Sequence, residues 1–352
     1  MIIYYSLFIM AFLLVFLDYE RNNHFHKIVY VLFSASIILF VAFRPLGVDN
    51  DSENYNTIFT SISKLSVSEI LMSQRVYGVL EKGFMLLNLL AYHLFGNFRA
   101  VLIGMALLTG IINYTFFYKF SPYPFFTLLF YLSFFFLYRD FTQIRYAIAG
   151  SLIFWGVYFW SNKRYILSII IILISSQFHD SAFIIFPVLI LLSFVKSRKF
   201  LFILPFFCLI GLFVNFFPLL LGYGFGTEHI ELYLDETGFA GLSVSIVGYI
   251  VMIAINYLEK RGHIEKTAFI DHSFIILSLG VSFNLLFCQT SIFQRFSYLM
   301  FQFAIILLPQ VFVAKVPANK KIYLVGLHLC FTLFCLFYGI RMINQDLIRP
   351  YF

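Results

Sequence analysis

Long runs of apolar residues, broken by short polar stretches, repeat along the chain. Many of these runs reach roughly 17–25 residues, which is enough helix to cross about 30 Å of hydrocarbon. A helix forms its backbone hydrogen bonds within its own segment, as the membrane interior requires. The pattern therefore predicts an all-α polytopic membrane protein with about 12 transmembrane helices. The expected spans are residues 2–17, 27–43, 98–118, 122–138, 143–160, 165–178, 181–195, 200–221, 243–258, 268–288, 294–313 and 322–340.

Residues 81–95 form a shorter and more polar segment than the expected spans. The segment opens with Glu81 and Lys82, and its apolar residues are interrupted by Asn88 and His93. About 15 residues of helix is short for a full crossing. We therefore expect a re-entrant or interfacial helix over 81–95.

The composition agrees with this pattern. The chain of 352 residues is 61% hydrophobic and only 12% charged, which excludes an ordinary soluble domain. Its four cysteines lie in apolar runs without paired spacing, so neither a disulfide framework nor a zinc site is expected. We expect one polytopic membrane domain over residues 1–352, with outer loops at 44–80 and 222–242.

Four of the polar breaks carry dense basic clusters, which mark the cytoplasmic side by the positive-inside rule. If residues 81–95 do not cross, the other breaks can be assigned to a side from these clusters. The inside then holds ten lysines and four arginines, and the outside holds two lysines and eight arginines. The clusters are Lys163 and Arg164; Lys196, Arg198 and Lys199; Lys260, Arg261 and Lys266; and Lys315, Lys320 and Lys321.

The surplus of arginine on the outer side points to the charge of a ligand. A guanidinium is planar, always charged and binds phosphate through two parallel hydrogen bonds, whereas lysine acts as a point charge. Orientation alone would use the two residue types equally. The bias therefore predicts a phosphate-bearing substrate outside the cytoplasm, and the alternative is chance together with arginines that reach lipid headgroups.

The first outer loop presents several polar residues in a short stretch. It leaves the second span at Arg44 and turns at Pro45. Asp49 and Asp51 follow, and Tyr55 closes the stretch. These acids could supply a base, bind sugar hydroxyls or hold a metal. A solvated loop without a ligand is the alternative.

A second polar cluster contains Arg139, Asp140 and Arg145. Arg145 lies just inside the start of an expected span, where a lone charge is costly unless it faces a polar cavity. Arg145 is therefore a candidate site residue. Arg139 is a weaker candidate, because pairing with Asp140 is an alternative explanation for it.

A third polar break on the outer side contains His179 and Asp180. A histidine titrates near neutral pH and can take a proton from a hydroxyl. Asp180 is explained by capping of the next helix. Capping does not explain His179, which is therefore a candidate base.

The remaining outer positions add cations and one long loop. Arg295 opens an expected span, and Arg341 and Arg349 lie near the end of the sequence. The glycine-rich stretch 222–241 has the length and turn chemistry of a flexible lid that binds an acceptor, and a plain connector is the alternative.

Six stretches of the sequence, in this order, resemble the EpsG/Wzy-type family of exopolysaccharide and O-antigen repeat-unit polymerases. They are spread over most of the chain. Two positions depart from the family pattern: Tyr146 stands where the family often has Gln, and Lys82 where it often has Pro. The matching stretches are FRPLGVDNDSENY, EKGFMLLNLL, QIRYAIAG, FHDSAFIIFP, QRFSY and RPYF.

The resemblance implies a glycosyltransferase at the outer face of the bacterial cytoplasmic (inner) membrane. It implies transfer of a growing glycan from an undecaprenyl diphosphate carrier to a hydroxyl of the next lipid-linked repeat unit. A chain-length regulator protein is an expected partner, and nucleic acid is not. We expect no metal or other cofactor, because arginines can neutralise the diphosphate.

Departure of the diphosphate builds negative charge, which fixed cations in a low-dielectric cleft stabilise most in the transition state. We therefore expect Arg145 to act in catalysis. His179 is the first candidate for the base that deprotonates the acceptor hydroxyl, and Asp49 is the second. The expected diphosphate- and glycan-binding residues are Arg44, Arg295, Arg341, Asp51, Tyr55 and Arg139.

Two other functions use similar chemistry. A flippase for lipid-linked oligosaccharides would also need a cationic cavity, but its arginines would line a pathway to both sides and an internal repeat would be common. An O-antigen-type ligase would use the same donor with a different acceptor. The one-sided arginines favour the polymerase over the flippase, whereas the ligase is barely separated from it.

Overall fold

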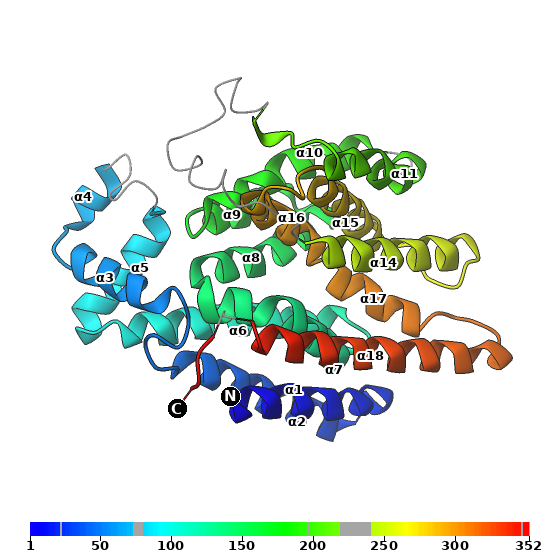
Figure 1. Cartoon of the computed structure of the whole chain (residues 1–352), viewed down its shortest axis with the longest axis horizontal. Helices are drawn as coiled ribbons and strands as arrows, with labels where there is room; N and C mark the ends of the chain where they lie inside the picture. Colours follow the sequence, from blue (N-terminus) through cyan, green and yellow to red (C-terminus); the bar gives the residue numbers. More distant parts are fainter. Residues whose placement is uncertain (22, 73–79, 196–197, 219–240, 346–347, 352) are drawn as a thin grey trace. The chain divides into compact units, whose positions relative to one another are not determined.

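The computed structural model describes residues 1–21, 23–72, 80–195, 198–218, 241–345 and 348–351. Within these ranges the regular secondary structure is helical, and extended pairing is limited to a single antiparallel bridge between Asp49 and Ile348. The all-α prediction is therefore confirmed (Figure 1).

Seven helices in the described ranges are long and apolar enough to cross a membrane, or eight if a bent pair counts as one span. The chain is therefore a multi-pass membrane protein, but the predicted count of 12 spans is not confirmed. The bent pair is Ser291–Phe301 with Ala304–Phe312, at 43°. The seven helices are Ile2–Glu20, His24–Ala42, Arg99–Phe120, Pro124–Thr142, Leu242–Lys260, Ala268–Leu286 and Ala318–Ile343.

Of the other expected spans, 143–160 forms the unbroken 18-residue helix Ile144–Ser161, whereas others are shorter or interrupted. The apolar helix Tyr165–Ser176 has only 12 residues. Pro205 lies inside Arg198–Cys208, and proline removes a hydrogen-bond donor from a helix interior. Long apolar runs in a sequence thus overstate the length of unbroken helix.

The chain divides into two compact units. Unit 1 comprises Met1–Gly156, Ile169–Asp180 and Ala318–Phe352, and unit 2 comprises Val157–Ser168 and Ser181–Pro317. The elements of unit 1 are α1 (Ile2–Leu14), η1 (Val15–Glu20), α2 (His24–Ala42), α3 (Ser52–Ile62), α4 (Val67–Met72), α5 (Lys82–Phe95), α6 (Arg99–Phe120), α7 (Pro124–Tyr131), η2 (Leu132–Thr142), η6 (Ala318–Lys320) and α18 (Lys321–Ile343), with the first part of α8 (Ile144–Ser161) and the last part of α9 (Tyr165–Ser176).

In unit 1, α2 packs along α6 and α1 packs along α18 (Figure 1). The α2–α6 pair is antiparallel: Arg21 Nη2 donates to the Tyr118 carbonyl at 3.0 Å near one end, and Arg99 Nη1 donates to the Phe43 carbonyl at 3.5 Å near the other. The two helices approach closely at Gly110, where a Cβ would lie only 2.3 Å from a side-chain carbon of α2. The chain from the end of α2 to the start of α6 thus leaves and returns at the same end of unit 1.

Three short helices, α3, α4 and α5, occupy that connection and share an apolar core with the first turns of α6 and α8. The segment predicted as a re-entrant or interfacial helix forms α5, with 14 residues. Phe84 and Met85 are fully buried in this core, and α5 ends at Gly96 with a positive φ of 67°. This small core places the N-terminus of α5 beside α8 and α9 of the same unit.

The span Pro124–Thr142 changes winding along its length. Its first part, α7, is α-helical, and η2 is π-helical and almost entirely buried. Ser133 ties η2 to α18 by a hydrogen bond to the Cys335 carbonyl at 2.7 Å. Such wide π windings are rare and are frequently found at functional sites. Here η2 carries both Arg139 and Asp140.

Unit 2 is held together at one end by charged side chains. Arg198 of α11 forms ion pairs with Glu259 of α14 and Asp271 of α15, and Lys266 lies 3.6 Å from Asp271. The predicted lid at 222–241 lies almost wholly outside the described residues. The elements of unit 2 are η3 (Asp180–Ile184), α10 (Ile185–Phe194), α11 (Arg198–Cys208), η4 (Leu209–Leu212), α14 (Leu242–Lys260), α15 (Ala268–Leu286), η5 (Ser291–Phe293), α16 (Gln294–Phe301) and α17 (Ala304–Phe312).

Candidate functional site

The basic residues of unit 1 divide by type between its two ends. Among the described residues of this unit, the end at which α2 finishes carries six arginines and two lysines, and the opposite end carries one arginine and four lysines. We call these the arginine end and the lysine end. The arginine end has Arg44, Arg99, Arg139, Arg145, Arg341 and Arg349 with Lys64 and Lys82; the lysine end has Arg21, Lys27, Lys119, Lys320 and Lys321.

Arg44 is the most deeply buried arginine at this end, with a side chain 0% exposed. Its Nε donates to Asp49 Oδ2 at 3.0 Å, and its Nη1 donates to the Val41 carbonyl at 3.0 Å. The guanidinium lies 5.2 Å from the Phe141 ring centroid. Arg44 Nη2 has no hydrogen-bond partner among the described atoms. The expected contact between Arg44 and a diphosphate thus stays a prediction, and in this structure the side chain is closed off from ligand.

Asp49 organises the loop that follows α2. Its second oxygen, Oδ1, accepts hydrogen bonds from the backbone N–H groups of Asp51 and Ser52, at 3.0 and 2.8 Å, at the start of α3. Its backbone pairs with Ile348, and the Arg349 N–H donates to the Val48 carbonyl at 2.7 Å. Both carboxylate oxygens of Asp49 are occupied, which suits a structural anchor better than a base.

Arg139 lies between aromatic rings. Its Cζ is 4.3 Å from the Phe135 ring centroid and 4.7 Å from the Tyr146 ring centroid, and the side chain is buried. Its Nη2 also donates to the Tyr146 hydroxyl at 3.5 Å. The Tyr146 ring in turn contacts the His179 imidazole, with centroids 5.1 Å apart. Tyr146 thus links the second and third polar clusters of the sequence.

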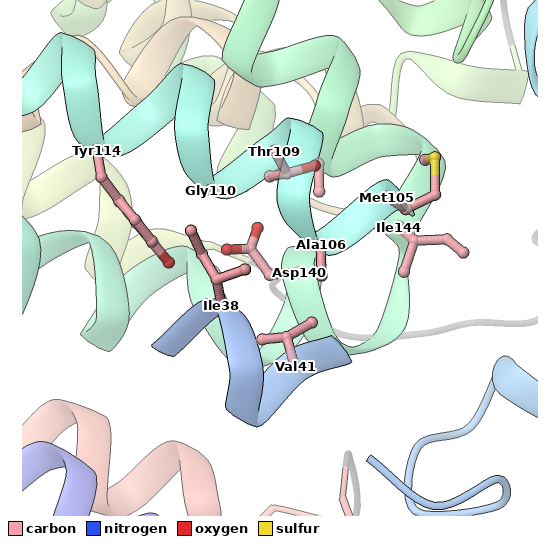
Figure 2. Close-up of a pocket in the computed structure, with 10 residues that line it drawn as sticks. Ile38, Val41, Met105, Ala106, Thr109, Gly110, Tyr114, Asp140 and Ile144 are labelled. Carbon is pink, nitrogen blue, oxygen red and sulfur yellow. The ribbon is translucent and has the colours of Figure 1, made fainter. Parts of the chain in front are cut away.

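Asp140 points into a small apolar cavity between α2, α6 and α8 (Figure 2). The cavity has about 10 Å³ of space, enough for about one water molecule. The Tyr131 hydroxyl donates to Asp140 Oδ1 at 2.6 Å, and Asn113 Nδ2 donates to the same hydroxyl at 2.9 Å. The sequence analysis gave pairing with Asp140 as the alternative explanation of Arg139. The two lie close enough for electrostatic attraction, but Asp140 takes its hydrogen bond from Tyr131.

Arg145 is the most accessible of the arginines that face the interior of this end. Its side chain is 16% exposed and forms an ion pair with Glu81, which is 7% exposed. Its Cζ lies 5.8 Å from the Tyr55 ring centroid and 5.6 Å from the Phe84 ring centroid. Arg145 and Tyr55 also share a side-chain hydrogen bond. Tyr55 thus lies beside Arg145, and its role in the site stays a prediction.

Glu81 also contacts the third polar cluster. Its Oε1 accepts a hydrogen bond from the Asp180 backbone N–H at 3.1 Å. The Phe84 N–H donates to the Gln177 carbonyl at 3.2 Å, which fixes the start of α5 against the end of α9. His179, partly buried, lies between these two contacts in sequence. Arg145, His179 and Tyr55 are therefore brought together by the fold.

Burial raises the pKa of the Glu81 carboxyl, against the opposing effect of Arg145. Glu81 and Tyr146 are the two neighbours of the site to which the sequence analysis gave no role. For Glu81 the signal was present, because a charged residue opens the short polar segment 81–95. For Tyr146 the signal was its departure from the family pattern beside Arg145.

The other predicted site residues have fewer contacts with the group formed by Arg145, Tyr55 and His179. Asp51 is partly buried and precedes α3, and its carbonyl accepts a hydrogen bond from the Tyr55 N–H. Arg341 and Arg349 are exposed at the arginine end. Arg295 lies at the start of α16 in unit 2, partly buried, and its position relative to the residues of unit 1 is not determined.

In the described part of the chain, no group of three or more His, Cys, Asp or Glu side chains is placed to hold a metal ion. The site instead offers a mostly buried guanidinium, a carboxylate, an imidazole and aromatic rings. Such a set can bind a phosphate group, move a proton and pack against a sugar ring.

Comparison with known proteins identifies one family. The family model described as the EpsG family matches residues 27–352. No curated protein and no solved structure matches the chain. EpsG membership suggests a function of the polysaccharide polymerase type. Since the match covers nearly the whole chain, this multi-pass membrane protein belongs to the EpsG family.

Proposed function

We propose that the protein is a polysaccharide polymerase. It transfers a growing glycan from an undecaprenyl diphosphate carrier to a hydroxyl of the next lipid-linked repeat unit. The reaction takes place at the outer face of the bacterial cytoplasmic membrane, where the arginine end of unit 1 lies.

One observation carries this proposal: the fold gathers Arg145, His179 and Tyr55 from three separate stretches of the sequence at the arginine end. The resulting site combines a phosphate-binding cation with a group that can accept a proton. Both are what a glycosyl transfer from a lipid diphosphate requires.

The acceptor hydroxyl oxygen attacks the anomeric carbon of the donor glycan, and the bond from that carbon to the diphosphate oxygen breaks. The bonding electrons remain on the departing diphosphate. Arg145 donates hydrogen bonds to this growing negative charge, and the low polarity around the site strengthens them. The hydroxyl proton passes to His179, whose imidazole is held in place by the Tyr146 ring.

His179 suits the role of base better than Asp49. The carboxylate of Asp49 is buried and already accepts three hydrogen bonds. Its use as a base would first require the first outer loop to open. Arg44 and Arg139 lie deeper than Arg145, and we assign them to support of the loop and of Tyr146.

The alternatives remain a flippase for lipid-linked oligosaccharides and an O-antigen-type ligase. A flippase would use cations along a pathway between both faces, whereas unit 1 concentrates arginine at one end. The ligase is distinguished from the polymerase by its acceptor, so the test must read out the product.

The experiment is the length distribution of the surface polysaccharide on a gel. A deletion strain is complemented with wild type, Arg145→Lys, His179→Ala or Lys320→Ala at equal membrane levels. We expect a single repeat unit for Arg145→Lys and for His179→Ala. We expect a full ladder for Lys320→Ala, because Lys320 lies at the lysine end. A deletion strain that keeps its ladder would refute the polymerase, and one that loses even the single unit would favour the flippase or the ligase.

A further inference from the structure

Glu81 restrains the accessible arginine of the candidate site. Its Oε2 pairs with Arg145 Nη1, and its Oε1 accepts a hydrogen bond from the Asp180 N–H. Both side chains of the pair are mostly withdrawn from water, but neither is completely enclosed. In this structure, Glu81 therefore occupies a position on Arg145 that a ligand anion could use.

The N-terminus of α5 is a rigid mount for Glu81. Gly83 approaches the residue that follows α9 so closely that a Cβ would lie 2.7 Å from the Gln177 carbonyl oxygen. The next N–H, of Phe84, donates to that same carbonyl at 3.2 Å. The carboxylate of Glu81 is thus aimed at Arg145 by backbone contacts between two helices.

A carboxylate and a phosphate bind a guanidinium through the same pair of oxygen acceptors. A phosphate group that reaches Arg145 must therefore compete with Glu81. The rings of Tyr55 and Phe84 contact the guanidinium whether it pairs with the Glu81 carboxylate or with a phosphate, and hold it in place in both cases. The Asp180 N–H offers the displaced carboxylate a hydrogen bond that it already makes.

We propose that Glu81 is the exchangeable counter-ion of Arg145, which the diphosphate of the donor displaces. In the ligand-free protein Glu81 neutralises and orients Arg145; in the donor complex it is held by the Asp180 N–H beside His179. This proposal rests on the proposed function and names Glu81 as a positioning residue of the same site. It differs from a purely structural ion pair because the pair must break during each cycle.

If Glu81 is an exchangeable counter-ion, removal of its charge should have opposite effects on donor binding and on kcat. Glu81→Gln keeps the size of the side chain and removes the charge that competes with phosphate. We expect it to bind donor about tenfold more tightly. We also expect a lower kcat, because Arg145 is no longer oriented before the donor arrives. A structural ion pair would instead lose folding and donor binding together.

The test uses the full-length protein purified in a zwitterionic detergent, with radiolabelled undecaprenyl diphosphate as the probe. Retention of the probe is compared for wild type, Glu81→Gln, Glu81→Asp and Glu69→Gln. Glu69 is a matched control, since it is exposed on α4 and, among the described residues, its carboxylate accepts hydrogen bonds from the N–H and the hydroxyl of Ser66. We expect tighter binding for Glu81→Gln, an intermediate gain for the shorter Glu81→Asp, and no change for Glu69→Gln.

Weaker or unchanged binding by Glu81→Gln would overturn the proposal. If Glu81→Gln does not fold, Glu81→Asp serves as the test, and weaker or unchanged binding of the probe by Glu81→Asp would then overturn the proposal. An equal gain with phosphatidylglycerol as the probe would also overturn it, since the site would then recognise any anionic headgroup. Because the measurement needs no acceptor and no turnover, a protein that exchanges Glu81 in this way but makes no polymer would refute only the proposed function.

Discussion

The ring of Tyr146 packs edge-on against the imidazole of His179, with centroids 5.1 Å apart and ring planes at 74°. The same tyrosine lies against the buried guanidinium of Arg139. One fully buried side chain thus positions both a candidate base and a buried cation. We therefore expect the orientation of His179 to depend on Tyr146.

Replacement of Tyr146 should separate packing from hydrogen bonding. Tyr146→Phe keeps the ring and should retain folding and most polymer synthesis. Tyr146→Ala leaves a cavity and should lower the free energy of unfolding by about 3–5 kcal/mol. It should also abolish the ladder, because His179 loses its contact. Thermal unfolding in detergent and the polysaccharide gel measure the two effects, and a Tyr146→Ala variant with a full ladder would contradict the assigned role.

The buried pair of Arg44 and Asp49 should be more costly to break than to replace. Arg44→Met alone leaves a buried carboxylate without its cation and should destabilise the protein by about 3–5 kcal/mol. The double variant Arg44→Met with Asp49→Leu should be much closer to wild type. Denaturant unfolding of wild type, the two single variants Arg44→Met and Asp49→Leu, and the double variant gives the coupling free energy. Additive effects would show that the two side chains act independently.

The general outline of the fold and of the site follows from the sequence, for a physical reason. Membrane helices expose their apolar composition directly in the sequence, and the polar breaks between them carry Arg145 and His179. The partner of a charged residue is not encoded in that pattern. Glu81 and Arg145 are 64 residues apart, and they meet only because α3, α5, α6 and α8 form a small core.

Burial was the second property that sequence patterns did not provide. Arg44 and Arg139 were expected to bind ligand because they stand in polar stretches, yet both are closed off by aromatic rings. The π winding of η2 was also not expected, since it depends on packing against α18 as well as on local propensity. The predicted count of 12 spans is not confirmed, because apolar runs in a sequence do not show where a helix breaks.

The lysine end offers a test of stability without the candidate site. The Asp18 carboxylate accepts hydrogen bonds from the N–H groups of Phe125 and Phe126, at 3.0 and 2.8 Å, and so caps the start of α7. Asp18→Ala removes the cap and should lower the free energy of unfolding by about 0.5–2 kcal/mol. Donor binding at the arginine end should be unchanged in the folded fraction. A large loss of donor affinity would indicate coupling between the ends of unit 1.

The pKa of Glu81 predicts how its contribution to stability changes with pH. Burial raises this pKa above its ordinary value of 4.5, so the folded protein holds the proton more tightly than the unfolded chain. The contribution of Glu81 to the free energy of unfolding is therefore full below its ordinary pKa. This contribution declines as the pH rises through the pKa of the folded protein. The titratable and charged groups around it are Arg145, Tyr55, His179 and Asp180.

The comparison protein for this prediction is Glu81→Gln, which cannot ionise at this position. The melting temperature of wild type relative to Glu81→Gln should fall as the pH is raised from about 4 to about 8. Thermal unfolding of both proteins across this range measures the difference. A difference that grows with pH would mean that attraction to Arg145 outweighs the burial of the carboxylate.

Residues 348–351 contact the end of α2 and the loop that follows it, which has a consequence for when the site can form during synthesis. The Arg349 N–H holds Val48, the Tyr351 hydroxyl donates to the Phe40 carbonyl, and Ile348 pairs with Asp49. A ribosome delivers the Arg44–Asp51 loop to the membrane early and these residues late. Until residues 348–351 arrive, a nascent chain has this loop without its support, so we expect the arginine end to become competent only after these residues have been inserted.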